Sequence, residues 1–189
     1  MNTTFTLDKR INKVFPTEVR HNGSTFSINA DFRNILRIIR MNNDTDVLSL
    51  QKPYLIAKWF FNDEFPDIDS AMDIFEEFMG SGDESERAQE PMFDFEFDAE
   101  EIYASFLKDY SIDLLEIPFM HWRKFLILLS NLSDESPFRQ KIKLRFMDLT
   151  GYKGKELLKL MEAKEAAQIP IRYTKEELAE MAEFEAEWG

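Results

Sequence analysis

The chain has 189 residues, and its 36 acidic and 23 basic residues give a formal net charge of -13 at pH 7. Hydrophobic residues make up 44% of the chain, which is enough to bury a core and excludes global disorder. The chain has no cysteine, which excludes disulfides and thiolate chemistry, and it lacks both a run of about 18 apolar residues and a signal-peptide pattern, so we expect a soluble protein that is not exported.

A β-hairpin and three helices are predicted in the first 79 residues. Asn22-Gly23 tolerates the positive φ of a two-residue turn, so a hairpin is expected over residues 15–28. A helix is predicted after the hairpin because apolar residues recur there with helical spacing, and Asn29 or Asp31 can cap its start. The next two helices are expected from Ser49 or Pro53 to about Phe60, and from about Asp67 to Met79, where Gly80 ends the last.

The negative charge is concentrated in two segments. Residues 80–101 hold nine acidic residues and one basic residue, and residues 174–189 hold six acidic residues and one basic residue. These two segments therefore account for the whole net charge of -13. The part from Gly80 to Pro91 has no large apolar anchor, which predicts a mobile linker. The sequence therefore divides into an N-terminal hairpin with helices at 1–79, an acidic linker at 80–91, a helical core region at 92–173 and an acidic C-terminal helix at 174–189.

The second half opens with alternating apolar and acidic residues from Met92 to Asp98. This pattern is typical of a half-buried strand, or of an extended arm that docks its Phe rings in a groove. Asp98 is a candidate N-cap for a helix that ends near Tyr110, and Glu101 would complete a capping box. Pro118 is expected to start the most buried helix, which has one apolar face made of Phe119, Trp122, Phe125, Leu126 and Leu129.

Three more helices are expected after this core helix. Ser133 or Asp134 would cap a helix that ends at Gly151, and another should run from about Lys155 to Ala167. The last, from Thr174 to about Trp188, has a narrow apolar stripe that either packs on the chain itself or is offered to another protein. The expected fold class is mainly α, a bundle of about seven helices with a small N-terminal β-hairpin.

The sequence contains no pattern that indicates catalysis, a metal site or a cofactor. Its two histidines, His21 and His121, lie far apart in sequence, and neighbouring carboxylates on a helix do not converge. Residues 151–155 lack the spacing of a phosphate loop. A basic stretch at 139–164 is interpreted as a solvated helix face, which could attract the acidic tail. A nucleic-acid site is the less favoured interpretation, because nucleic-acid-binding domains usually carry an excess of basic residues and this chain does not. We expect neither an enzyme nor a nucleic-acid-binding protein.

Several motifs in residues 15–150 occur in an order that resembles a known family. Asp98 is followed by Ile102-Tyr103-Ala104-Ser105-Phe106, by Tyr110-Ser111-Ile112-Asp113-Leu114 and by His121-Trp122-Arg123-Lys124-Phe125, and Ile28-Asn29-Ala30-Asp31-Phe32-Arg33 precedes them. This series resembles the phage gene-product-15 family of tailed phages and prophages, which usually has Gly where this chain has Ser111. The signature residues, interpreted as shared core or as an interaction site, are Asp31, Phe32, Arg33, Asp98, Tyr103, Phe106, Tyr110, Ile112, Asp113, His121, Trp122 and Phe125.

The resemblance implies a role in tail morphogenesis, because members of the family are usually encoded beside the tail-tube and tape-measure genes. We therefore expect a tail assembly chaperone that acts in the host cytoplasm on tape-measure or tail-tube proteins, with self-association as a further possibility and no membrane contact. An acidic protein rich in Phe, Met and Trp could coat apolar helices and keep them in solution. The candidate partner-binding residues are Phe93, Phe95, Phe97, Leu178, Met181 and Trp188.

The sequence is also compatible with two other functions. The protein could be a permanent component of the virion, in the tail or at the head–tail junction. It could also be an acidic inhibitor that mimics DNA and blocks a host enzyme. Concentration of the acidic residues in two segments argues against mimicry, since mimicry needs a long rigid array of charges.

Overall fold

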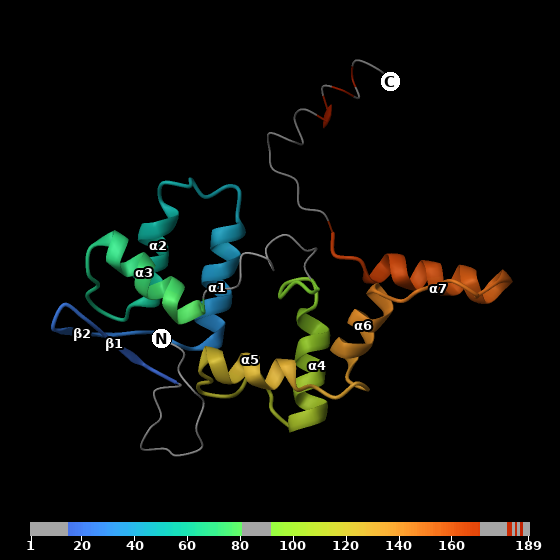
Figure 1. Cartoon of the computed structure of the whole chain (residues 1–189), viewed down its shortest axis with the longest axis horizontal. Coiled ribbons are helices and arrows are strands. Elements are labelled where there is room, and N and C mark those ends of the chain that lie inside the picture. The colour runs from blue at the N-terminus through green and yellow to red at the C-terminus, as the bar shows by residue number, and fades with distance from the viewer. Residues whose placement is uncertain (1–14, 81–91, 171–180, 183, 185, 187–189) are drawn as a thin grey trace.

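The computed structural model describes residues 15–80, 92–170, 181, 182, 184 and 186 (Figure 1). Seven helices and one two-stranded sheet occur in this part of the chain, so the protein is mainly α, as the sequence predicts. Residues 81–91 of the predicted linker and most of the predicted C-terminal helix lie outside the described residues. No helix that the structure describes is both long enough and apolar enough to cross a bilayer.

The predicted hairpin is present and leads into the core. Strands β1 (Glu18–His21) and β2 (Ser24–Ser27) are antiparallel, with Val19 opposite Phe26. Asn22 and Gly23 have φ values of 48° and 81°, which is why this pair can close the turn. The chain after β2 pairs with the end of the second helix, through a bridge between Ile28 and Phe61.

The three predicted N-terminal helices are confirmed. They are α1 (Phe32–Asn43), α2 (Lys52–Phe60) and α3 (Ile68–Met79). The side chains of Asp31 and Asp67 cap α1 and α3 by accepting backbone N–H groups of their first turns. Gly80 ends α3 with a φ of 86°, a conformation that favours glycine.

The second half contains α4 (Ala99–Tyr110), α5 (Trp122–Ser130), α6 (Pro137–Arg145) and α7 (Gly154–Ala167). Helix α5 starts at Trp122 and not at Pro118, because the side chain of His121 caps it, and Phe119 is 51% exposed instead of buried. Ser136, rather than Ser133 or Asp134, caps α6, and α6 ends before Gly151.

The segment from Met92 to Asp98 is a turn, which corrects the prediction of an extended strand. The Asp94 side chain accepts the N–H groups of Glu96 and Phe97, both at 2.8 Å, and this local bonding bends the chain. Asp98 does precede α4, but its carboxylate makes no capping hydrogen bond and the predicted capping box is absent.

The buried hydrophobic residues of both halves form one core. Phe125 of α5 stacks on Phe32 of α1, with ring centroids 4.7 Å apart, and on Phe106 of α4, at 5.2 Å. Helix α7 is the exception to this close packing. It lies against α6 and extends away from the rest of the molecule (Figure 1), and Ala167, near its C-terminal end, is its one fully buried residue.

Helix α4 ends in a strained residue that suggests a stabilising substitution. Ser111 has a φ of 53°, and the N–H groups of Ser111 and Ile112 donate to Leu107 and Phe106 in a Schellman arrangement. We expect Ser111→Gly to raise the free energy of unfolding by up to about 1 kcal/mol, because relief of the left-handed strain exceeds the chain entropy that glycine adds to the unfolded state.

Urea denaturation of Ser111→Gly and of Ser130→Gly, a matched change at the last residue of α5, tests this expectation. The control should lose stability, by about 0.5–1 kcal/mol, since Ser130 lies within a helix. A loss of stability in both variants would show that Ser111 is not strained.

Candidate functional site

The signature residues at the start of α1 form a clamp on the loop before α5. The Asp31 carboxylate accepts Nε and Nη2 of Arg33 at 2.8 and 2.9 Å and the N–H of Met120 at 3.1 Å. Arg33 also donates to the carbonyl groups of Ile117 and Pro118, at 3.0 and 3.1 Å. One ion pair therefore holds together two segments that are more than 80 residues apart in sequence.

The surroundings of the clamp favour the ionised form of the Asp31 carboxylate. Burial alone would raise the pKa of Asp31, but hydrogen bonds from the Arg33 side chain and from the Met120 N–H outweigh burial and lower it. Asp31 therefore stays ionised at neutral pH, and its charge is matched by the guanidinium of Arg33. The clamp holds the fold together and leaves neither group free for a substrate.

His121 caps α5 and links it to the start of the hairpin. Its Nδ1 accepts the N–H of Arg123 at 3.1 Å, and its Nε2 lies 3.0 Å from the carbonyl oxygen of Pro16. Because a carbonyl can only accept, Nε2 carries the proton and Nδ1 is bare. Burial lowers the pKa of His121, and the rings of Phe15 and Phe78 lie 5.2 and 5.7 Å from the imidazole. His121 is therefore a neutral structural group.

The aromatic signature residues belong to the core. Trp122 stacks on Phe125 at 5.7 Å, and its indole N–H has no hydrogen-bond partner within the described part of the chain. The Tyr110 hydroxyl donates to the Leu128 carbonyl at 2.8 Å, which ties α4 to α5. Half-buried Ile112 also packs against the core.

Asp113 organises the turn after α4. Its carboxylate accepts the Tyr103 hydroxyl at 3.1 Å and the N–H of Leu115 at 2.9 Å. The hydrogen bond from Tyr103 to Asp113 raises the pKa of Tyr103. This pair therefore fixes the turn against α4.

The remaining signature residue, Asp98, lies at the centre of a buried ion cluster formed with Lys141 and Arg145. Asp98 is 1% exposed and accepts Nη2 and Nη1 of Arg145 at 2.8 and 3.2 Å. Lys141 Nζ lies 3.0 Å from the same carboxylate, and the N–H of Asp94 donates to it at 3.0 Å. Burial alone would raise the pKa of Asp98, but these donors, with Arg145 the strongest, lower it.

Arg145 extends this cluster to two other segments. Its Nε donates to the Ala167 carbonyl at the end of α7, at 2.7 Å, and its Nη1 donates to the Met92 carbonyl at 2.6 Å. Lys141 adds a contact with Glu101 at 2.9 Å and lies 4.2 Å above the Phe97 ring. The cluster therefore connects α4, α6, α7 and the turn at 92–98.

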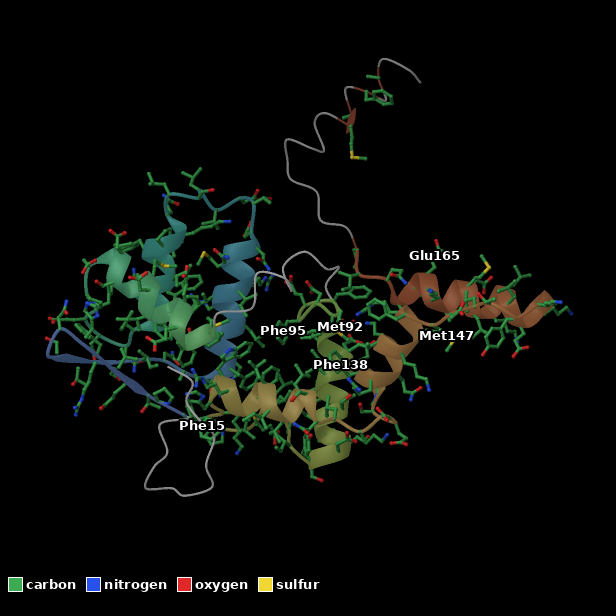
Figure 2. All side chains as sticks on the ribbon, viewed as in Figure 1. Phe15, Met92, Phe95, Phe138, Met147 and Glu165 are labelled. Carbon is green, nitrogen blue, oxygen red and sulfur yellow. The ribbon has the colours of Figure 1, made fainter. Side chains whose placement is uncertain are left out.

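The candidate partner-binding residues fall into two groups. Phe93 and Phe95 are half-buried and pack on Phe138 and Trp122, at centroid distances of 5.4 and 5.7 Å, and so contact the chain's own core (Phe95 and Phe138 are labelled in Figure 2). Phe97 lies under Lys141 of the ion cluster. Met181 is 46% exposed, while Leu178 and Trp188 lie outside the described residues.

One groove lies between α1 and the turn at 92–98. It has a volume of about 520 Å³ and is lined by Arg33, Leu36, Arg37, Ile39, Arg40 and Asn43 of α1 and by Phe93, Asp94, Phe95 and Glu96 of the turn. Its floor is apolar and its α1 side carries three arginines. The sequence shows these arginines among the residues of α1, but no sequence pattern could reveal the second wall, which comes from the turn at 92–98.

Sequence reasoning also missed a set of exposed apolar residues between the end of α6 and the middle of α7. We call this set the apolar arm and define it by Phe146 at the end of α6, Tyr152 in the loop before α7, and Leu158 and Met161 of α7, which are 52, 38, 61 and 49% exposed. The signal in the sequence is the pair of doublets Leu157-Leu158 and Leu160-Met161, which give α7 more large apolar residues than one helix face can bury.

Within the residues described, no group of three or more His, Asp or Glu side chains is placed to hold a metal ion. The buried polar groups of the clamp and the ion cluster are occupied by contacts within the protein.

Comparison with known proteins gives one match. A family model described as Bacteriophage Gp15 protein matches residues 11–169. No curated protein and no solved structure matches the chain.

The buried ion cluster predicts a large loss of stability on removal of one charge. We expect Arg145→Met to lower the free energy of unfolding by about 3–5 kcal/mol, because Asp98 would keep a buried charge without its bidentate partner. Arg139→Met is the matched control on the same helix. Arg139 is 41% exposed and 3.6 Å from Asp134, so its loss should cost less than about 1 kcal/mol.

Urea denaturation at neutral pH measures both changes. The double variant Asp98→Asn/Arg145→Met should recover part of the loss, because it removes the uncompensated charge. Equal effects of Arg145→Met and Arg139→Met would contradict a structural role for the cluster.

The His121 cap predicts a pH-dependent stability. The folded protein holds His121 below its ordinary pKa of 6.5, so the unfolded chain takes up the proton first and stability falls as the pH drops below about 6.5. In His121→Asn, an uncharged cap replaces the imidazole, and this fall should shrink between pH 6.5 and 5.

Chemical denaturation at several pH values in this window provides the measurement. His21→Asn changes the other histidine, which lies at the hairpin turn, and should retain the slope of the parent protein. An unchanged slope in His121→Asn would mean that His121 is not the titrating group.

Proposed function

The chain belongs to the bacteriophage Gp15 family, and from this premise we propose that it is a phage tail assembly chaperone that acts in the host cytoplasm without catalysis. Its client is an apolar helical segment of a tape-measure or tail-tube protein. The single observation that carries this proposal is the apolar arm, whose four large side chains remain exposed.

The shape of the arm suits a helical client. Helix α7 contacts its own chain through α6 and through its C-terminal end, so Leu158 and Met161 lie one helical turn apart on an open surface. Exposed apolar surface of this kind usually marks a binding site, and flexible Met and Leu side chains adapt to different apolar partners. An amphipathic client helix can lay its apolar stripe along such a surface.

The charges on α7 balance, since the helix carries three lysines and three glutamates. The client is therefore selected by its apolar stripe and not by the sign of its charge. The chaperone itself has a net charge of -13, and this charge would keep a complex with an apolar client in solution.

The proposal predicts that two arm residues are needed for client binding. We expect Leu158→Glu/Met161→Glu to reduce recovery of the phage's own tape-measure or tail-tube protein about tenfold or more in a co-expression pull-down, because the variant buries two carboxylates against an apolar client. Circular dichroism should show an unchanged thermal midpoint, since both side chains are exposed.

Lys159→Glu is the matched control. It changes the net charge by the same amount on the same helix but leaves the apolar side chains in place, so recovery should fall much less. Undiminished recovery with the double variant would contradict the arm as the client site. Presence of the protein in purified virions would indicate a structural tail component instead, and capture of a host enzyme in place of tail proteins would support the inhibitor hypothesis.

A further inference from the structure

The groove between α1 and the turn at 92–98 has the features of a docking site. Leu36, Ile39, Phe93 and Phe95 supply its apolar floor, and its volume of about 520 Å³ accommodates a few large side chains. We call it the arginine groove because Arg33, Arg37 and Arg40 line its α1 side.

The positive charge of the arginine groove is only partly matched within the described residues. Arg37 stacks on the Trp59 ring at 3.9 Å and makes no salt bridge with any residue that the structure describes. Arg40 pairs with Glu96 at 2.9 Å, but both side chains are largely exposed, at 75 and 46%. Arg33 is held by Asp31 in the clamp. The α1 side of the groove, which we call its rim, can therefore attract a further anionic group at Arg37 and Arg40.

The acidic C-terminal segment at 174–189 has the complementary pattern. It carries six Glu and one Lys, and its apolar residues Leu178, Met181, Phe184 and Trp188 recur at helical spacing. Met181 and Phe184 are helical and are 46 and 65% exposed. A helix of this composition offers large apolar side chains for the floor and carboxylates for the rim.

The C-terminal segment also starts close to the arginine groove. Arg145 binds the Ala167 carbonyl with Nε and the Met92 carbonyl with Nη1, so the end of α7 lies next to the residue that precedes the groove wall at Phe93. From Pro170, the 19 remaining residues span up to about 60 Å when extended. A tethered ligand at this range has an effective concentration of the order of millimolar, so even weak docking would be populated.

We propose that the acidic C-terminal segment at 174–189 docks as a helix in the arginine groove of its own chain, with its apolar stripe on the floor and its carboxylates against Arg37 and Arg40. This interaction is independent of the apolar arm, so its test does not depend on the proposed function.

The absence of native cysteine allows a direct distance measurement on the full chain. Spin labels at Asn42→Cys, an exposed residue of α1 beside the groove, and at Ala186→Cys, in the C-terminal segment, report the separation by pulsed electron paramagnetic resonance. Docking predicts one narrow distance peak at no more than about 25 Å, the length of a 16-residue helix. This peak should weaken when salt is raised from about 0.05 to 0.5 M, because the rim contacts are exposed.

Two variants in the doubly labelled chain test the two sides of the interface. Arg37→Glu reverses a rim charge and should replace the narrow peak with a broad distribution, whereas Arg20→Glu, the same charge change on the hairpin, should retain it. Met181→Asp/Phe184→Asp makes two of the four residues of the apolar stripe polar without touching the core, and should also abolish the peak.

Three results would overturn the proposal. The first is a broad distribution in the parent chain. The second is a narrow peak that survives both Arg37→Glu and Met181→Asp/Phe184→Asp. The third is a peak that disappears on dilution with unlabelled protein, which would show that the segment docks on a second copy.

Discussion

The bidentate pair between Asp98 and Arg145 is the interaction on which the second half of the structure depends. A buried carboxylate in this position must be matched by a buried cation, and Arg145 is the only residue among those described that contacts Asp98 while also reaching Met92 and Ala167. This requirement explains why the acidic segment before α4 bends into a turn instead of running as a strand. It also explains why Asp98 begins α4 without capping it, since its carboxylate is occupied by charges that lie about 45 residues away in sequence.

The clamp of Asp31 and Arg33 performs a related task in the first half, and the aromatic stack around Phe125 joins the two halves into one core. Most of the family signature is thereby assigned to structure: ion pairs, a histidine cap and packed rings. The surfaces that remain for binding, the apolar arm and the arginine groove, contain one signature residue between them, Arg33. A family can therefore keep a common scaffold while the contacts that select a partner vary outside its motifs.

Local signals in the sequence predict local structure well in this protein. Asn22-Gly23 identifies the hairpin, Asp31 and Asp67 identify two helix starts, and Gly80 identifies a helix end, because each acts within a few residues of its own position. Pro118 and Ser133 mislead because distant hydrogen bonds hold both: Arg33 holds the loop before α5, and the Asp109 carboxylate accepts the Ser133 N–H and hydroxyl. The alternation at 92–98 misleads because the Asp94 carboxylate bends the chain locally and Arg145 holds the turn. The groove and the arm could not be predicted for a similar reason. Periodicity shows that a helix has an apolar side, but whether that side is exposed depends on which helices pack against it.

The way α7 is attached has a mechanical consequence. Its C-terminal end is held by Arg145, and its N-terminal end is tied to the body, within the described residues, only by the loop that follows α6. Because a helix is stiff along its axis, any tilt at Ala167 displaces the end at Gly154 more than the base. For the chaperone role proposed above, such a lever would widen the reach of the apolar arm toward an extended client chain, while Arg145 keeps its base fixed to the body of the protein.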